Sequence, residues 1–410
     1  MEKLLVWIND RFPLTKVLEE HATKYYAPKN FNFWYYFGIL ASVVLVNQIV
    51  TGIFLTMHYK PDTTLAFASV EFIMRDVEWG WLIRYMHSVG ASMFFIVVYL
   101  HMFRGIIYGS HRKPRELIWL FGMLIFVALM AEAFMGYLLP WGNMSYWGAQ
   151  VIISLFDAIP YIGHGLSEWI RGDFVVGDAT LNRFFAFHVI ALPLVIVALV
   201  FVHIVALHKV GSNNPDGVEI KKKKGADGIP LDGIAFHPYY TVKDLVGVVV
   251  LLMVTSAIIF FSPALGGWFL ESNNFIPANI LQTPPEIVPL WYFTPYYSIL
   301  RAVTYPLFGV DAKVWGVLAM GSSIVVLFLL PWLDRSPVKS IRYRGWIFKL
   351  ALGLFIISFF TLGYLGTKPP SGLFKTIAQV CSVLYFAFFL LMPWYTKIDK
   401  TKPVPERVTP

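Results

Sequence analysis

The feature that most constrains this chain is a set of eight long apolar segments distributed along its 410 residues. The hydrocarbon core of a bilayer is about 30 Å thick, so a helix that crosses it needs about 20 mostly apolar residues. The segments that meet this requirement are approximately 33–57, 84–107, 115–138, 184–207, 244–264, 314–332, 346–366 and 373–393. The sequence therefore predicts an all-α polytopic membrane protein with eight transmembrane helices.

The composition agrees with this prediction. Charged residues make up 14% of the chain and apolar residues 57%, whereas about a quarter of the residues in a soluble domain are charged. These values exclude a cytosolic enzyme, a disordered chain and a nucleic-acid-binding module, so no nucleic-acid partner is expected. We interpret the net charge of +8 as a topology signal.

Positive charges are unequally divided between the two sides of the membrane. With eight spans both termini lie on one side, and the segments on that side hold 22 Lys and Arg residues, against 8 in the opposite loops. Cytoplasmic loops are enriched in these residues, so both termini are expected in the cytoplasm. The run Lys221–Lys224 then lies in a cytoplasmic loop, where a solvated topology determinant is favoured over a docking patch.

The spans and loops predict five regions. These are an amino-terminal interfacial segment, a four-helix bundle, a basic cytoplasmic loop, a carboxy-terminal four-span region and a cytoplasmic tail, at 1–32, 33–210, 211–243, 244–396 and 397–410. Two connections on the opposite side, 139–183 and 265–312, are too long and too apolar to be plain linkers. Short surface helices are expected there, and long structured loops are often functional.

Four histidines lie within two of the spans, His87 and His101 in the second and His188 and His203 in the fourth. An ionisable side chain inside a span is costly and points to function. At about 100° and 1.5 Å per residue, the two imidazoles of each helix share one broad face and stand about 21–22 Å apart along the axis. Because these spans run in the same direction, His87 is level with His188, and His101 is level with His203.

Two imidazoles that face each other across a gap can hold a six-coordinate haem iron. The single cysteine, Cys381, and the absence of a Cys-x-x-Cys-His run exclude covalent haem attachment. The pattern therefore predicts two non-covalent haems with bis-histidine iron. Hydrogen bonds to neighbouring helices would explain one or two buried histidines. They would not explain two facing pairs at matching depths, which we call the histidine ladder.

Glycines form a second ladder in the neighbouring spans. Gly38 and Gly52 in the first span, and Gly122 and Gly136 in the third, are also fourteen residues apart. These spans run opposite to the histidine helices, which places Gly52 and Gly136 at the level of the outer histidines and the other two at the inner level. Glycine lets a flat macrocycle approach the backbone closely. Helix packing is the alternative explanation.

Arg84 and Arg104 lie three residues outside His87 and His101, toward the two membrane faces. There a guanidinium could pair with haem propionates. Snorkelling to the interface would explain the same positions equally well.

Several further sequence stretches are highly specific when taken together. They are Arg84-Tyr85-Met86-His87, the heptapeptide GYLLPWG at 136–142, the run RFFAFH at 183–188, His208 followed by GSNNP at 211–215, and FHPYY at 236–240. Together with the histidine ladder, they resemble the cytochrome b subunit of the quinol:cytochrome c oxidoreductase, or cytochrome bc, complex. The resemblance covers nearly the whole chain.

This resemblance implies two haem b groups, with His87 and His188 as ligands of the outer, low-potential haem and His101 and His203 as ligands of the inner, high-potential one. It places Arg84 and Arg183 by the outer propionates, and Arg104 and Ser110 by the inner ones. It also implies a homodimeric complex in a bacterial inner membrane, with a Rieske iron-sulfur protein and a c-type cytochrome as partners.

The implied reaction is quinol oxidation at the outer face, coupled to proton translocation. One electron passes to the Rieske protein, and the other crosses the outer and then the inner haem to reduce a quinone at the inner face. Whether the quinone is ubiquinone or menaquinone stays open at this point.

The outer pocket departs from the family in one position. The family usually has Pro-Glu-Trp-Tyr, whereas this chain has Pro289-Leu290-Trp291-Tyr292. Glu286 lies four positions earlier and could replace the missing carboxylate from one helical turn away, since i and i+4 share a helix face; a solvated Glu is the alternative. The remaining outer-pocket residues that the resemblance implies are Gly148, Pro289, Trp291, Tyr292 and Tyr297.

At the inner face, His208 follows the ligand His203 by five residues, and Asp244 stands beside Lys243 at the start of the next span. A His and an Asp at one surface could deliver protons to a reduced quinone. Helix-end residues placed favourably on the helix dipole are an equally good explanation from the residues alone. With the resemblance, His208, Ser212, Lys243 and Asp244 are expected to form the inner quinone pocket.

Two other classes of protein are weighed against this prediction. The membrane anchor of a hydrogenase or formate dehydrogenase also carries two haems, but needs neither an outer oxidation pocket nor the further spans. A transporter could use its histidines as a proton relay without a cofactor. Haem absorption and co-purifying subunits distinguish the three.

Overall fold

The computed structural model describes residues 2–409, and these residues are predominantly helical. Within them, eight helical segments are long and apolar enough to cross a membrane, which confirms the predicted fold class. The segments are Phe33–Thr56, Gly80–Ile107, Glu116–Leu138, Asp178–Val210, Phe236–Phe261, Ala312–Leu333, Trp346–Leu365 and Gly372–Leu390. The fourth begins before the predicted position because a helix from Asp178 continues into it. The fifth does so because a π turn at Phe236–Tyr240, kinked at His237, precedes it.

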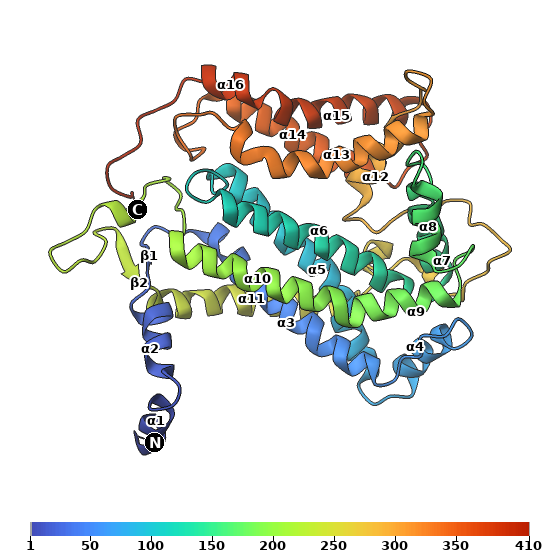
Figure 1. Ribbon diagram of the computed structural model, residues 1–410, viewed down its shortest axis with the longest axis horizontal. Coiled ribbons are helices and arrows are strands. Elements are labelled where there is room, and N and C mark those ends of the chain that lie inside the picture. Colours follow the sequence, from blue (N-terminus) through green and yellow to red (C-terminus); the bar gives the residue numbers. More distant parts are fainter. Residues whose placement is uncertain (1, 410) are drawn as a thin grey trace.

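The four histidines lie between two pairs of helices. Helix α3 (Tyr36–Thr56) packs along α5 (Gly80–Ile107), and α6 (Glu116–Leu138) packs along α10 (Leu192–Val210). Helix α9 (Asp178–Ala186) continues through a π-helical turn into α10, so the fourth span is one long rod (Figure 1). π-Helical turns inside α-helices often mark functional sites, and this one carries His188.

The remaining spans occupy two places around these pairs. Helix α11 (Thr241–Phe261) packs against α3 and α5. Helices α12 (Thr294–Ala302), α13 (Ala312–Leu333), α14 (Trp346–Leu365) and α15 (Gly372–Leu390) pack on one another as a separate layer, and α13 joins this layer to α6 (Figure 1). The sequence groups α11 with the carboxy-terminal spans, but in the structure it contacts α3 and α5, and α5 carries His87 and His101.

Both termini lie at the same end of the helical layers (Figure 1), as an even number of spans requires. We call this end the inner side and the opposite end the outer side, after the topology predicted from the charges. The inner side holds a small antiparallel sheet of β1 (Tyr26–Pro28) and β2 (Gly233–Ala235). The other elements on this side are also short: α1 (Glu2–Asn9), α2 (Leu14–Leu18), a π turn (Glu19–Thr23), a π turn (Phe236–Tyr240) and α16 (Met392–Ile398).

The outer side carries the surface helices that the sequence predicts for the first long connection. They are α7 (Asn143–Phe156) and α8 (Gly163–Arg171), with α4 (Ala66–Arg75) in the loop before α5. The second long connection has only 3-10 turns at Leu265–Gly267 and Ser272–Asn274 before α12. Hydrogen bonds from Asn143 N to Ile276 O (2.9 Å) and from Ser145 N to Asn274 Oδ1 (2.8 Å) tie this connection to the start of α7.

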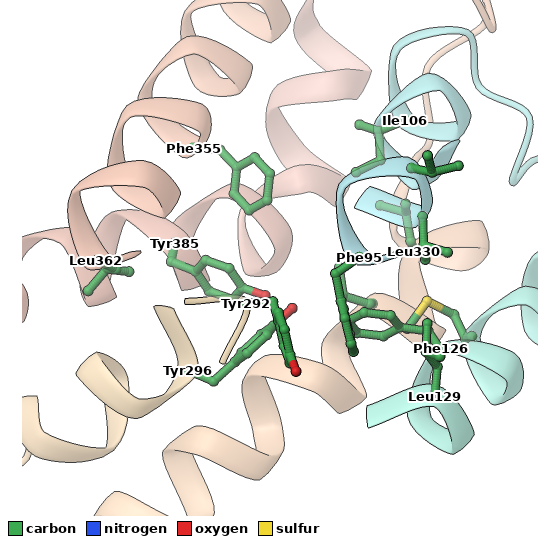
Figure 2. Close-up of a cluster of buried hydrophobic side chains, with 14 of the residues drawn as sticks. Phe95, Ile106, Phe126, Leu129, Tyr292, Tyr296, Leu330, Phe355, Leu362 and Tyr385 are labelled. Atoms are coloured by element: carbon green, nitrogen blue, oxygen red, sulfur yellow. The ribbon is translucent and has the colours of Figure 1, made fainter. Parts of the chain in front are cut away.

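An aromatic cluster joins the carboxy-terminal layer to α5 and α6 (Figure 2). The ring of Tyr292 stacks on Phe95 with centroids 3.9 Å apart and planes 6° from parallel. The Tyr99 hydroxyl donates to the Tyr292 carbonyl at 2.6 Å. Stacked aromatic pairs add about 0.5–1.5 kcal/mol beyond the burial of their surface. These contacts hold the Pro289–Tyr292 segment against the histidine helix α5.

Buried ion pairs fasten the inner loops. The carboxylate of Glu219 contacts Arg115 at 2.7 Å and also pairs with Lys339 at 2.5 Å. Burial raises the pKa of Glu219, but the hydrogen bonds and charges of these two cations outweigh it and lower the pKa to about 2. The basic loop after α10 is therefore bound to the rest of the inner side through an ionised carboxylate.

Candidate functional site

The outer histidines face each other between α5 and the π turn before α10. The ring centroids of His87 and His188 are 6.1 Å apart. The Thr51 hydroxyl donates to the Asn47 carbonyl at 2.6 Å and therefore accepts from Nδ1 of His87, 2.9 Å away. Nδ1 of each ring can thus carry the proton, since His188 Nδ1 lies 3.0 Å from two acceptors, the carbonyl and Oε1 of Glu132. This arrangement leaves Nε2 of both rings free to bind a metal.

The inner histidines also face each other, toward the opposite end of the same helices. The ring centroids of His101 and His203 are 6.4 Å apart. The predicted level matching of the four histidines is therefore confirmed, and each level holds one facing pair.

All four predicted glycines lie against one histidine each. A Cβ built on Gly38, Gly52 or Gly122 would come within 3.3–3.4 Å of the Cε1 atom of His101, His87 or His203, and a Cβ on Gly136 would collide with His188. The glycines therefore make room for the imidazole edges themselves, a more specific role than the predicted accommodation of a macrocycle.

Both levels fit a haem. Two metal–imidazole bonds of about 2 Å each place the ring centres about 6 Å apart, as the two pairs do. The outer pair opens into a cavity of about 520 Å³ and the inner pair into one of about 350 Å³. Among residues 2–409 no group of three or more His, Cys, Asp or Glu could bind a bare ion, so two-ligand sites suit an iron that brings its own equatorial ligands.

The predicted propionate partners divide between the two cavities. Arg84 lines the outer cavity. Arg104 and Ser110 line the inner one, and Nε of Arg104 is buried without a hydrogen-bond partner among the described residues. Such an atom requires an anionic or polar partner, and a propionate would satisfy it. Arg183 does not line the outer cavity; its guanidinium donates to the carbonyl of Trp169.

The outer cavity extends to the connection before α12. Leu290 and Tyr292 line it together with Phe269 and Leu270. Trp291 points to α5, where its Nε1 donates to Ser92 Oγ at 3.2 Å. The other predicted outer residues do not line the cavity. They are Pro289, Gly148, which approaches the ring of Tyr137, and Tyr297, whose hydroxyl donates to the Ile287 carbonyl.

The structure corrects the role expected for Glu286. Residues 286–290 form no helix, so Glu286 does not occupy the position of a residue one turn later. Its side chain is exposed and does not line the outer cavity. Its charge acts electrostatically on Arg301 of α12.

Sequence reasoning missed two carboxylates. Glu132 lines the outer cavity in α6, and an acidic residue inside a span was a signal that could have found it. Glu271 is half-buried beside the cavity residue Leu270, and accepts a hydrogen bond from the Tyr137 hydroxyl at 3.2 Å. Burial raises the pKa of Glu271, and the Tyr137 hydrogen bond partly opposes this shift. Nothing in the sequence near Glu271 distinguishes it from a solvated loop residue.

All four predicted inner-pocket residues line the inner cavity: His208, Ser212, Lys243 and Asp244. The amino-terminal segment also contributes, which the sequence did not indicate. Tyr25 stacks on His208 with ring centroids 4.6 Å apart, and Phe31 lines the same cavity. The lining of the inner cavity therefore combines a histidine pair, an arginine, proton-carrying side chains and aromatic rings from the amino-terminal segment.

Comparisons with known proteins agree with this geometry. Residues 22–211 match the family described as cytochrome b/b6/petB, and residues 277–386 match the family described as cytochrome b(C-terminal)/b6/petD. Cytochrome b of Allochromatium vinosum is 62% identical over 99% of this chain and 98% of its own length. Cytochrome b of Rickettsia bellii is 49% identical over 99% of this chain and 96% of its own.

A solved structure titled hyperthermophilic respiratory Complex III has a TM-score of 0.86 and 38% identity, covering 96% of this chain and 99% of its own. Eight apolar helices with facing histidine pairs define a multi-pass membrane protein of the haem-binding, electron-transporting class. The chain belongs to the cytochrome b family, and haem b binding follows from that membership.

Proposed function

We propose that this chain is the redox subunit of a quinol:cytochrome c reductase, which oxidises a quinol at the outer cavity and reduces a quinone at the inner one. The observation that supports this most directly is the pair of stacked sites: each cavity joins one facing histidine pair to a pocket with proton-carrying side chains. Two haem b groups, held by His87 with His188 and by His101 with His203, would supply the one-electron relay between them.

At the outer site, the chain must bind a quinol and accept its protons. Tyr292, fixed by its stacking on Phe95, and Leu290 would form the apolar wall. Glu271 is the proposed proton acceptor, because a half-buried carboxylate with a raised pKa titrates nearer to working pH than an exposed one. Glu286 is assigned no role in this step, because its side chain is exposed.

At the inner site, the chain must hold a quinone and supply protons to it. His208 and Asp244 line the same cavity from α10 and α11 and are the proposed proton donors. Ser212 and Lys243 would orient the quinone oxygens. The resident side chains thus divide into a proton-accepting set at one end of the histidine ladder and a proton-donating set at the other.

The partners and location follow from the proposed reaction. We expect a Rieske iron-sulfur protein and a c-type cytochrome subunit, a homodimeric complex, and a bacterial inner membrane with both termini in the cytoplasm. The charge asymmetry between the two sides supports the orientation, and the identity to the respiratory Complex III chain supports the assembly.

The decisive experiment replaces one ligand of each pair in turn. His188→Ala should remove the outer haem and abolish quinol oxidation, while His203→Ala should remove the inner haem; the exposed His164 gives a matched control as His164→Ala. Haem per chain is measured from the reduced optical bands of the purified complex. Retention of both bands in His188→Ala would refute the proposal. If the variants lose haem but no Rieske protein co-purifies with the wild type, the hydrogenase-type anchor is favoured. If the wild type itself contains no haem, the transporter is favoured.

A further inference from the structure

The ligand His188 has an unusual neighbour for a residue inside a membrane span. Nδ1 of His188 donates to the backbone carbonyl of Glu132 at 3.0 Å and also lies 3.0 Å from Oε1 of the Glu132 carboxylate. Both side chains are more than four-fifths buried. The second carboxylate oxygen of Glu132, Oε2, is buried and has no hydrogen-bond partner among the described residues. A carboxylate inside a span is costly, so this one needs a reason beyond packing.

Two of the other three predicted ligands have a neutral or a cationic neighbour at the same ring position, and Nδ1 of His203 is buried without a hydrogen-bond partner among the described residues. Nδ1 of His87 meets the Thr51 hydroxyl at 2.9 Å. Nδ1 of His101 lies 3.4 Å from a terminal nitrogen of Arg104. The outer level also has a cation, Arg84, on its cavity wall, but no hydrogen bond or ion pair joins Arg84 to either outer histidine among residues 2–409. The carboxylate contact is thus specific to one ligand of the outer pair.

This contact has a predictable effect on a metal bound at Nε2. The hydrogen bond from Nδ1–H to the Glu132 carbonyl fixes the tautomer and the ring orientation of His188. The carboxylate beside the same nitrogen adds a negative charge close to the metal, and a nearby negative charge favours the oxidised iron over the reduced iron. A guanidinium near a ligand acts in the opposite direction.

We propose that Glu132 lowers the reduction potential of the outer haem by placing a buried negative charge 3.0 Å from Nδ1 of His188. The inference rests on the proposed assignment of His188 as a haem ligand. An arginine acts electrostatically on a histidine at both levels, Arg84 on His87 and Arg104 on His101. Glu132 is therefore the charge that distinguishes the outer level from the inner one, and it favours electron transfer from the outer to the inner haem.

The test is a redox titration of both haems in the purified complex carrying Glu132→Gln, which keeps the shape of the side chain and removes its charge. We expect the equilibrium constant for reduction of the outer haem to rise about tenfold, which is about 59 mV for a one-electron couple, with the inner haem unchanged. Glu116→Gln is the matched control, because it removes one carboxylate from the inner end of the same helix.

The haem content of the same preparation separates the two levels of inference. A change of less than threefold in Glu132→Gln, with both haems present, would overturn the role of Glu132 and leave the ligand assignment intact. If Glu132→Gln loses the outer haem, the redox titration is carried out instead on Glu132→Asp, which keeps the charge, and Glu132→Asn, which removes it. The Asp variant should then keep the lower potential and the unshifted electron paramagnetic resonance line of the ferric outer haem. Equal potentials in the two variants would refute the proposal.

Discussion

The backbone of Gly136 lies so close to the imidazole of His188 that a Cβ at this position would collide with the ring. The other three glycines of the ladder each adjoin one further histidine at ordinary contact distance or slightly less. The position of each proposed ligand is therefore set by a missing side chain on the helix opposite to it, as well as by its own hydrogen bonds.

Gly136→Ala should displace His188 and deplete the outer haem. Extra atoms in a well-packed site cost about 1–3 kcal/mol, which would lower haem affinity by about tenfold or more. The measurement is the ratio of the two reduced optical bands in the purified complex. Gly353→Ala is the control, because a Cβ at Gly353 in α14 meets nothing within 4 Å. An unchanged band ratio in Gly136→Ala would contradict the close fit.

Arg104→Gln should lower the reduction potential of the inner haem. The guanidinium lies 3.4 Å from Nδ1 of His101, and removing a cation favours the oxidised iron. We expect the inner equilibrium constant for reduction to fall by about threefold to tenfold, with the outer haem unaffected. A redox titration with both haems resolved measures this; an equal shift at both haems would point to a general structural change.

Tyr137→Phe should move the pH dependence of quinol oxidation. The Tyr137 hydroxyl hydrogen bond lowers the pKa of Glu271, which burial raises, so its loss raises that pKa further. Because Glu271 must be ionised to accept a proton, the acidic limb of the pH–rate profile should shift to higher pH. Glu271→Gln should slow the reaction about 10²-fold or more.

The matched controls for the outer site are Glu286→Gln, at the exposed carboxylate, and Tyr146→Phe, whose hydroxyl accepts from Gln150. Both should retain wild-type profiles. A slow Glu286→Gln variant beside a normal Glu271→Gln variant would reverse the assignment of the proton acceptor.

Glu219→Gln should destabilise the inner side in a pH-dependent way. The pKa of Glu219 is about 2 in the folded chain against an ordinary value of 4.5, so its contribution is complete above pH 4.5 and is lost as the pH falls toward 2. We expect a loss of about 1–3 kcal/mol at pH 7, because Arg115 and Lys339 lose their partner. The measurement is thermal unfolding of the detergent-solubilised complex; Glu406→Gln, in an exposed ion pair, should leave the midpoint unchanged.

The sequence by itself determined the eight spans, the level matching of His87 with His188 and of His101 with His203, and the glycine that belongs to each level. These properties depend on helix pitch, span length and chain direction, which are local or additive along the chain. The inner pocket could also be predicted, because His208 lies at the end of the fourth span and Asp244 at the start of the fifth, and both positions are therefore at the same membrane face.

The tertiary structure alone decided which charged side chains reach the cavities. It brought Glu132 and Glu271 to the outer site, left Glu286 exposed, and turned Arg183 toward Trp169. It also placed α11 against α3 and α5. These contacts join residues far apart in the chain through irregular loops, whose backbone path has no period that a sequence pattern can reveal, so only the packed arrangement specifies them.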